Sequence, residues 1–105
     1  MIDLYTWSTP NGRKVSVMLE ECGLAYTPHL MNLQEGQHRT PEFRKLNPFA
    51  RVPVIVDHDA PGGDFAVSET TAILSYLAEK SGKFLPADAR QRSEVTQWLS
   101  FIAAN

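Results

Sequence analysis

The feature that most restricts the fold of this chain is a short apolar run at its N-terminus that leads through a turn into a helical pattern. Residues 2–7 are nearly continuously apolar and rich in β-forming side chains, which is typical of a buried strand. Residues 8–12, Ser-Thr-Pro-Asn-Gly, interrupt this run. An amphipathic helix is predicted next, because Gly23 can cap its end and apolar side chains recur at helical spacing: Val15, Met18, Leu19 and Cys22.

The alternation of strands and helices continues along the chain. Residues 26–33 are predicted to form a second strand. Thr40 followed by Pro41 predicts the start of a short helix, because threonine caps helices and proline suits their first turn. Residues 52–57 and 65–67 are predicted to be the two strands of a hairpin.

A further helix is predicted after Ser68, whose hydroxyl can cap it, and Gly82 can end it. Ile73, Tyr76 and Leu77 repeat at helical spacing within it. The predicted order of elements is therefore β-α-β-α-β-β-α. One helix between the first two strands implies a parallel crossover, and the later hairpin adds antiparallel strands. The chain is thus predicted to be an α/β protein with helices packed on a mixed sheet, which is a thioredoxin-like fold.

A length of 105 residues suits one compact core. We predict one domain at residues 1–82, a linker at 83–87, and at 88–105 the first helix of an all-helical domain that is otherwise missing from this chain. Asp88 and Gln91 can form a capping pair for that helix. Its apolar stripe needs a cover, which can be the sheet domain, further helices or a second copy of the chain. The stripe comprises Val95, Trp98, Leu99 and Ile102.

Composition and charge exclude several classes of function. The net charge of −2 gives no basic excess for tracking the phosphates of a nucleic acid. Cys22 is the single cysteine, which excludes an internal disulfide, a C-x-x-C redox pair and a zinc site of several thiolates. No uncharged stretch approaches the ~20 residues needed to cross a bilayer. We expect a cytoplasmic protein that binds neither nucleic acid nor membrane and holds no metal.

The turn at residues 8–11 is the first place suited to chemistry. The free N–H groups and the dipole of the following helix favour an anion such as a thiolate. This turn holds hydroxyls and an amide but no cysteine, so a ligand must bring the sulfur. The alternative interpretation is that Ser8 or Thr9 merely caps the helix, with Pro10 in its first turn.

Val52-Pro53, at the start of an apolar strand, is the second such place. A cis bond before proline costs little, and it would leave the backbone groups of Val52 free to hold a peptide. The alternative is an ordinary trans proline that begins an edge strand.

The third place suited to chemistry is Ser68-Glu69-Thr70, at the predicted start of a helix. The N–H groups and hydroxyls there could bind a carboxylate, while Glu69 could take an ammonium group. Plain helix capping would explain the same residues.

The three places together describe a pocket for an extended peptide that has a thiol, a backbone amide pair and an α-amino acid end, and glutathione has all three. Over nearly its whole length the sequence resembles the N-terminal domain of the glutathione transferases, most of all the bacterial nu class and its fungal nitrogen-regulatory relatives. The resemblance lies in residues 9–12 (TPNG), 36–43 (GQHRTPEF), 47–53 (NPFARVP) and 69–74 (ETTAIL).

The resemblance implies roles for individual residues in binding glutathione. It places the backbone of Val52, beside a cis Pro53, against the cysteinyl part of glutathione. It places Glu69 and Thr70 at the γ-glutamyl end, where Thr70 stands in place of the usual serine, keeping the hydroxyl and adding a methyl group. Two further residues match positions near the ligand in that group: His38 and Arg51.

The group that stabilises the glutathione sulfur is open between two interpretations. By resemblance to the nu class, Asn11 with Thr9 would hydrogen-bond the sulfur. Ser8, two residues before Pro10, instead matches the activating serine of theta-like and delta-like classes. Tyr5 is a weaker candidate, since its strand position favours packing in the core.

The resemblance also implies an activity. It indicates an enzyme that uses glutathione as cosubstrate, in a homodimer, to act on an electrophile or to reduce a disulfide. The alternative is a non-catalytic binding or regulatory module that keeps the fold. The joint presence of Asn11, Val52, Pro53, Glu69 and Thr70 favours the enzyme.

Overall fold

The N-terminal apolar run forms strand β1 (Ile2–Thr6), an inner strand of a four-stranded sheet, in a computed structural model that describes residues 1–104. The other strands are β2 (Tyr26–Leu30), β3 (Val54–Asp57) and β4 (Phe65–Ser68). Their order across the sheet is β2-β1-β3-β4. Strand β1 pairs with β2 in parallel and with β3 antiparallel, and β3 pairs antiparallel with β4. The predicted mixed sheet is confirmed.

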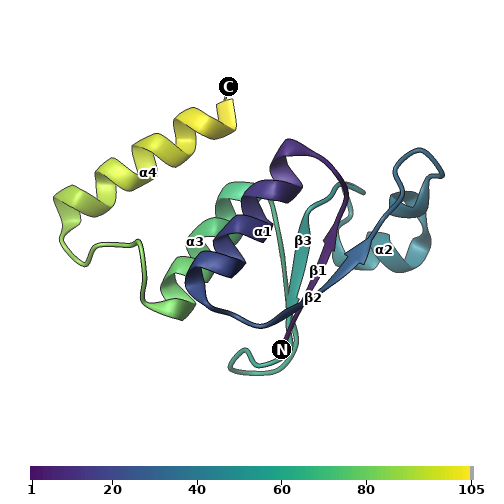
Figure 1. Cartoon of the computed structure of the whole chain (residues 1–105), viewed down its shortest axis with the longest axis horizontal. Coiled ribbons are helices and arrows are strands. Elements are labelled where there is room, and N and C mark those ends of the chain that lie inside the picture. Colours follow the sequence, from purple (N-terminus) through teal and green to yellow (C-terminus); the bar gives the residue numbers. More distant parts are fainter. Residues whose placement is uncertain (105) are drawn as a thin grey trace.

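Helices α1 (Pro10–Cys22) and α3 (Thr70–Ser81) lie side by side against one face of this sheet (Figure 1). A 3₁₀ turn, η1 (Gln37–Arg39), and the short helix α2 (Pro41–Leu46) belong to the segment between β2 and β3. The ring of Phe43 on α2 packs edge-on against that of Tyr5, which alternates along β1 with the buried residues of the opposite face. Helix α2 therefore covers the second face of the sheet.

The hydrophobic core lies between the sheet and the pair α1 and α3. The strand residues that point to this side alternate with partly exposed ones along β1, as a strand with one buried face requires. The helices contribute residues spaced three and four positions apart, which share one helical face. The core cluster consists of Ile2, Leu4, Val15, Leu19, Ile55, Val67, Ile73 and Leu77.

Several element bounds differ from those predicted. Strand β2 ends at Leu30, and β3 begins at Val54, after the proline. The predicted cap at Ser68 is wrong, because this residue is the last of β4 and pairs with Val54. The N-cap of α3 is Glu69, and its side chain makes no capping hydrogen bond.

Helix α4 (Ala89–Ala104) follows an irregular connection and stands apart from the layer formed by α1 and α3 (Figure 1). The side chain of Asp88 accepts a hydrogen bond from the backbone N–H of Gln91 at 3.0 Å, as the sequence predicted. The predicted helical segment 88–105 includes Asn105, which lies outside the described residues. Within residues 1–104, no helix is both long and apolar enough to span a membrane.

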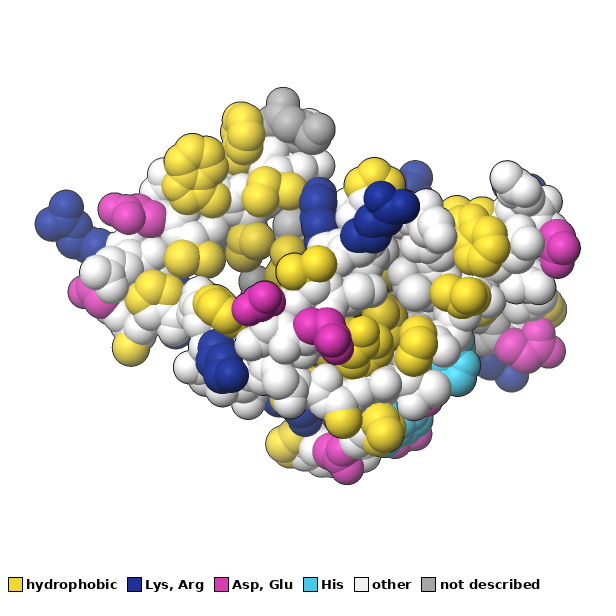
Figure 2. Space-filling view, viewed as in Figure 1, with side chains coloured by type: hydrophobic (Ala, Val, Ile, Leu, Met, Phe, Trp, Pro, Cys, Tyr) yellow, Lys and Arg dark blue, Asp and Glu magenta, His cyan; other side chains and the backbone are white. Residues whose placement is uncertain are grey.

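The apolar residues of the α4 stripe differ in their burial. Val95 and Leu99 are half-buried and share a cavity of about 190 Å³ with side chains of α1 and α3. Trp98 is 63% exposed, and its ring packs edge-on against that of Phe101. In the space-filling view, hydrophobic side chains lie on both sides of the hollow between α4 and the rest of the molecule (Figure 2).

Candidate functional site

Two adjoining cavities lie at the edge of the sheet where the three predicted places for chemistry meet. The sheet topology explains the meeting: β1 ends there, β3 begins there in the opposite direction, and β4 returns to the same edge. The larger cavity has a volume of about 390 Å³ and the smaller about 70 Å³. The smaller one is lined by Asn11, Arg51, Val52, Pro53, Glu69 and Thr70.

The turn between β1 and α1 presents Asn11 to both cavities. Thr9 is the N-cap of α1, and its Oγ1 accepts a hydrogen bond from the N–H of Gly12 at 3.0 Å. A threonine hydroxyl can accept and donate at once, so Thr9 keeps a proton to donate. Pro10 opens the helix, where its missing N–H costs no hydrogen bond.

Gly12 lets the first turn of α1 lie directly against the end of β1. A Cβ atom at this position would come within 2.6 Å of the carbonyl oxygen of Trp7, and it would also clash with the hydroxyl of Thr6. Real side chains do not tolerate such distances. Glycine at this position therefore allows the close packing that sets where Asn11 stands.

Three predicted site residues lie outside both cavities. Ser8 is exposed and has no side-chain hydrogen bond within the described part of the chain. Thr9 acts as the cap described above. His38 lies in η1, and its Nδ1 atom is buried with no hydrogen-bond partner among residues 1–104.

The peptide bond between Val52 and Pro53 is cis. Strand β3 begins after it, at Val54, so Val52 takes no part in the sheet ladder. Neither the N–H nor the C=O of Val52 has a hydrogen-bond partner among the residues described. Both groups are thus available at the smaller cavity to an extended peptide.

Asn47, which is not among the site residues predicted from the sequence, holds the loop that leads to this peptide bond. The residue is buried; its Nδ2 donates to the carbonyl oxygen of Arg51 at 3.0 Å, and its Oδ1 accepts from the N–H of Phe49 at 3.1 Å. A buried asparagine that satisfies backbone groups fixes a loop that has no ladder of its own. The Asn-Pro pair at residues 47–48 is the signal that could have indicated this turn.

Glu69 has an unusual backbone, with a φ of 71° and a ψ of 122°. A non-glycine residue in this region is uncommon and persists where the surrounding structure requires it. Glu69 lines both cavities, and its carboxylate forms no ion pair within residues 1–104. The adjacent N-terminus of α3 offers free N–H groups and the Thr70 hydroxyl. This corner can therefore hold an ammonium group and a carboxylate together.

Two cations line the 390 Å³ cavity together with Glu69: Lys14 and Arg51. The ammonium group of Lys14 lies 3.3 Å from Oδ1 of Asn11, and Arg51 forms no ion pair in the part of the chain described. Lys14 is not among the site residues predicted from the sequence, although its position three residues after Asn11 on a helix predicts that the two side chains are neighbours. The residues of the site fit a zwitterionic ligand with a further negative charge.

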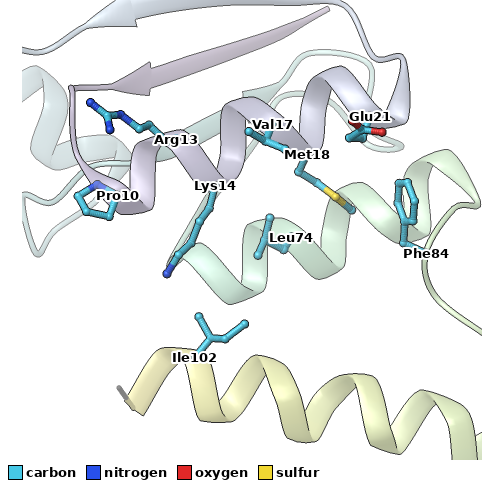
Figure 3. A pocket seen from close by; sticks show the side chains of 9 residues that line it. All are labelled: Pro10, Arg13, Lys14, Val17, Met18, Glu21, Leu74, Phe84 and Ile102. Atoms are coloured by element: carbon cyan, nitrogen blue, oxygen red, sulfur yellow. The ribbon is translucent and has the colours of Figure 1, made fainter.

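A larger, mostly apolar cavity adjoins the site. It has a volume of about 780 Å³ and lies between α1, α3 and α4 (Figure 3). Lys14 and Ile102 border both this cavity and the 390 Å³ one. The rest of its wall includes Val17, Met18 and Leu74. Among the described residues, no group of His, Cys, Asp and Glu side chains is suited to hold a metal ion.

Comparison with protein families matches residues 9–80 to the model described as "Glutathione S-transferase, N-terminal domain". Among curated proteins, the chain is 46% identical over 101 residues to "Disulfide-bond oxidoreductase YfcG" of Escherichia coli K12, covering 94% of this chain and 47% of that protein. It is 36% identical over 100 residues to "Transcriptional regulator URE2" of Saccharomyces cerevisiae, covering 90% of this chain and 28% of that one.

Among solved structures, the chain is similar to a glutathione transferase family member from Pseudomonas fluorescens with two glutathione molecules bound. The TM-score is 0.92 and the identity 46%, and the match covers 95% of this chain and 44% of that one. A glutathione transferase from Pseudomonas putida, with glutathione disulfide bound, matches with a TM-score of 0.91 and 46% identity over 95% of this chain and 44% of its own. The chain thus spans half or less of the length of these relatives.

Proposed function

This chain belongs to the glutathione S-transferase family, and we propose that it binds glutathione at the two adjoining cavities as part of a glutathione-dependent transferase or disulfide reductase. The observation that carries the proposal is the meeting of three sequence-distant turns at one sheet edge, where six of the predicted residues line one cavity. The chemistry of those residues matches the parts of glutathione one by one.

Each part of glutathione has a complementary group in the site. Glu69 would pair with the α-ammonium group, and the N-terminus of α3 with Thr70 would bind the α-carboxylate. The free backbone groups of Val52, beside Pro53, would pair with the cysteinyl residue as one strand pairs with another. The remaining carboxylate would lie near the Arg51 cation, which lines both cavities. The sequence resemblance also places His38 near the ligand, although its side chain lines neither cavity.

The sulfur would lie at the start of α1. There the helix dipole favours the thiolate over the thiol, and the side chains of Asn11 and Thr9 can donate hydrogen bonds to it. We assign the sulfur contact to these two residues. Ser8 is the alternative; like Thr9, it lines neither cavity.

The reaction follows from a thiolate held in this way. With an electrophile, the sulfur forms a bond to carbon as the leaving group departs with the bonding electrons. With a disulfide, the thiolate attacks one sulfur, the S–S bond breaks, and the other sulfur leaves as a thiolate that takes up a proton. A second glutathione thiolate then attacks the mixed disulfide, which releases glutathione disulfide and the second thiol.

The second substrate, assembly and location form part of the same proposal. The apolar cavity beside the site, lined by Val17, Met18 and Leu74, suits an apolar second substrate. We propose a homodimer in the cytoplasm, as the sequence resemblance implies, with residues 1–82 as the glutathione-binding domain, 83–87 as linker and 88–105 as the first helix of a helical domain. No metal enters this chemistry.

A non-catalytic regulatory module is the second candidate. The observation in its favour is the 36% identity to a protein named as a transcriptional regulator. The joint presence of Asn11, Val52 and Glu69 at one site favours the enzyme, because a purely structural module needs no sulfur contact.

Retention of the chain on immobilised glutathione, followed by elution with free glutathione, tests the proposal. We expect retention, and calorimetry of the eluted protein should give one saturable binding curve. A folded chain, judged by circular dichroism, that passes through the column and shows no heat of binding would contradict the proposal.

A further inference from the structure

The side chain of Lys14 contacts the amide of Asn11 beside the cavities. Its ammonium group lies 3.3 Å from Oδ1 of Asn11. An ammonium group has donors and no acceptor, so the Asn11 atom that faces it must be the carbonyl oxygen. No other hydrogen bond of the Asn11 side chain occurs in residues 1–104. The amide nitrogen, Nδ2, is therefore the end that remains to donate to a ligand.

The position of Lys14 is unfavourable by the usual rules of helix stability. The start of a helix carries a partial positive charge and favours acids, yet the first turn of α1 has none, and Arg13 and Lys14 follow one another there. Lys14 is half-buried and pairs with no carboxylate in the described part of the chain. The fold alone gives no reason for a cation at this place.

The surroundings of Lys14 connect it with the proposed ligand site. Its side chain extends from α1 into the space that separates this helix from Ile102 of α4 (Figure 3). The same side chain lines the 390 Å³ cavity together with Asn11 and Glu69. An anion bound beside Asn11 would convert the repulsion between Lys14 and the helix start into a favourable interaction.

We propose that Lys14 is a positioning residue that holds the Asn11 amide with Nδ2 toward the sulfur of bound glutathione. The proposal rests on glutathione binding at this site. A thiolate accepts hydrogen bonds, so an amide nitrogen facing it lowers the thiol pKa, whereas an amide oxygen facing it repels the charge. Without Lys14, the amide of the exposed Asn11 can turn its oxygen toward the sulfur, and the thiolate loses its donor.

The test is a titration of the thiol of bound glutathione, followed by the ultraviolet absorbance of the thiolate. Lys14→Met removes both donor and charge at nearly constant size, and it should raise the thiol pKa by about 0.5–1. Lys14→Arg keeps both properties and should restore a value close to that of the unchanged chain. Lys45→Met, which removes an exposed lysine on α2, serves as the matched control and should leave the pKa unchanged.

A double-mutant cycle separates positioning from a direct effect of charge. If Lys14 acts through Asn11, Lys14→Met should shift the pKa in the Asn11→Ala background by less than half of its shift in the unchanged chain, an order-of-magnitude criterion for coupling. The affinity for S-methylglutathione, whose sulfur cannot ionise, should change less than about twofold in Lys14→Met, because the thiolate contact is the one lost.

Three results would overturn the inference. One is a thiol pKa in Lys14→Met equal to that of the unchanged chain. Another is a pKa shift caused by Lys14→Met that is equally large in the Asn11→Ala background and in the unchanged chain, since Lys14 would then act by its charge alone. The third is an equal loss of affinity for glutathione and S-methylglutathione, which would make Lys14 a ligand-binding cation. If the folded unchanged chain binds no glutathione, the proposed function fails and this inference fails with it.

Discussion

The hydroxyl group of Tyr76 donates a 2.6 Å hydrogen bond to Oδ2 of Asp57 and so joins helix α3 to the end of strand β3. Asp57 is fully buried, and the ammonium group of Lys80 lies 2.8 Å from the same oxygen. Burial raises the pKa of Asp57, but the hydrogen bonds from Lys80 and Tyr76 outweigh it and hold the pKa below its ordinary value. Burial, with the bond to Asp57, raises the pKa of Tyr76 to about 12.

This cluster fastens α3 at the end of the sheet opposite the cavities. Asp57 ends β3, whereas the residues that begin β3 lie at the site. The first turn of α3 carries Thr70, so the position of that turn depends on how the helix is held further along. The buried carboxylate therefore ties α3 to the end of the sheet opposite the site.

The first prediction concerns Lys80. Lys80→Met should lower the free energy of unfolding by about 2–3 kcal/mol, because it leaves the buried carboxylate of Asp57 without its cation. Chemical denaturation at neutral pH measures the change. Lys83→Met is the control: this lysine is exposed, and its loss should change stability by less than about 0.5 kcal/mol. Equal effects of the two substitutions would show that the ion pair adds no stability.

The second prediction concerns Glu69. Glu69→Gln keeps the size of the side chain but removes the charge that attracts an ammonium group. The affinity for glutathione should fall by about 1–3 kcal/mol, with little change in thermal stability. Calorimetric titration provides the measurement, and Glu94→Gln on the exposed part of α4 is the matched control. A dissociation constant equal to that of the unchanged chain would remove Glu69 from the site.

The third prediction concerns pH and His58. Its Nε2 lies 2.7 Å from Asp3 and its Nδ1 lies 3.0 Å from Asp64. Hydrogen bonds that the imidazole of His58 donates to these two carboxylates raise the pKa of His58 above 6.5. The contribution of His58 to stability is therefore fully present below about pH 6.5, the value for an unfolded histidine, and is lost as the pH rises through the higher folded value.

At acid pH the dependence of stability on pH has the opposite sign. Hydrogen bonds from His29 and then His58 lower the pKa of Asp3, so its contribution is present above its unfolded value and is lost as the pH falls through the folded one. Denaturation curves from acid to mildly alkaline pH should show a fall in stability above about pH 6.5 that is weaker in His58→Gln. His38→Gln removes a histidine that has no carboxylate partner in the described residues. This variant should show the same decrease in stability with rising pH as the unchanged chain. Parallel curves for His58→Gln and the unchanged chain would contradict the prediction.

The fourth prediction concerns the exposed face of α4. Trp98 is 63% exposed and Phe101 is 56% exposed, and burial of one large apolar side chain contributes roughly 1.5–3 kcal/mol. The 105-residue chain should therefore self-associate, with a sedimentation coefficient that rises with concentration. Replacing both residues with glutamine should shift the equilibrium toward monomer, whereas Ser100→Gln, at an exposed polar position, should not. A chain that is monomeric at every concentration would contradict this prediction.

The sequence by itself determined the order and type of the elements. A nearly continuous apolar run along residues 2–7 and apolar spacings of three and four along residues 13–22 are local properties, and they indicate a strand followed by an amphipathic helix. Pro10 and Gly23 act at the ends of α1 through local backbone chemistry, which is why they could be read directly, whereas the structure decided that Thr9 and not Ser8 is the cap. The mixed sheet then followed from the order of these elements.

Other features depended on distant neighbours and could not be predicted from local patterns. Ser68 looked like a helix cap, but pairing with Val54 draws it into β4, because ladder hydrogen bonds compete with a side-chain cap. The burial of Asp57 depends on residues about 20 positions away on α3, and a lone carboxylate in a strand gives no sign of them.

In the candidate site, too, the sequence and the tertiary structure determine different features. Its residue types were visible in the sequence, because a sulfur contact, a free peptide edge and a paired acid each require particular side chains. The tertiary structure decided which of them share a cavity: it brought Asn11, Val52 and Glu69 together and left Ser8 outside. Local propensity acts over a few residues, whereas a cavity exists only where strands far apart in the chain end at one edge of a sheet.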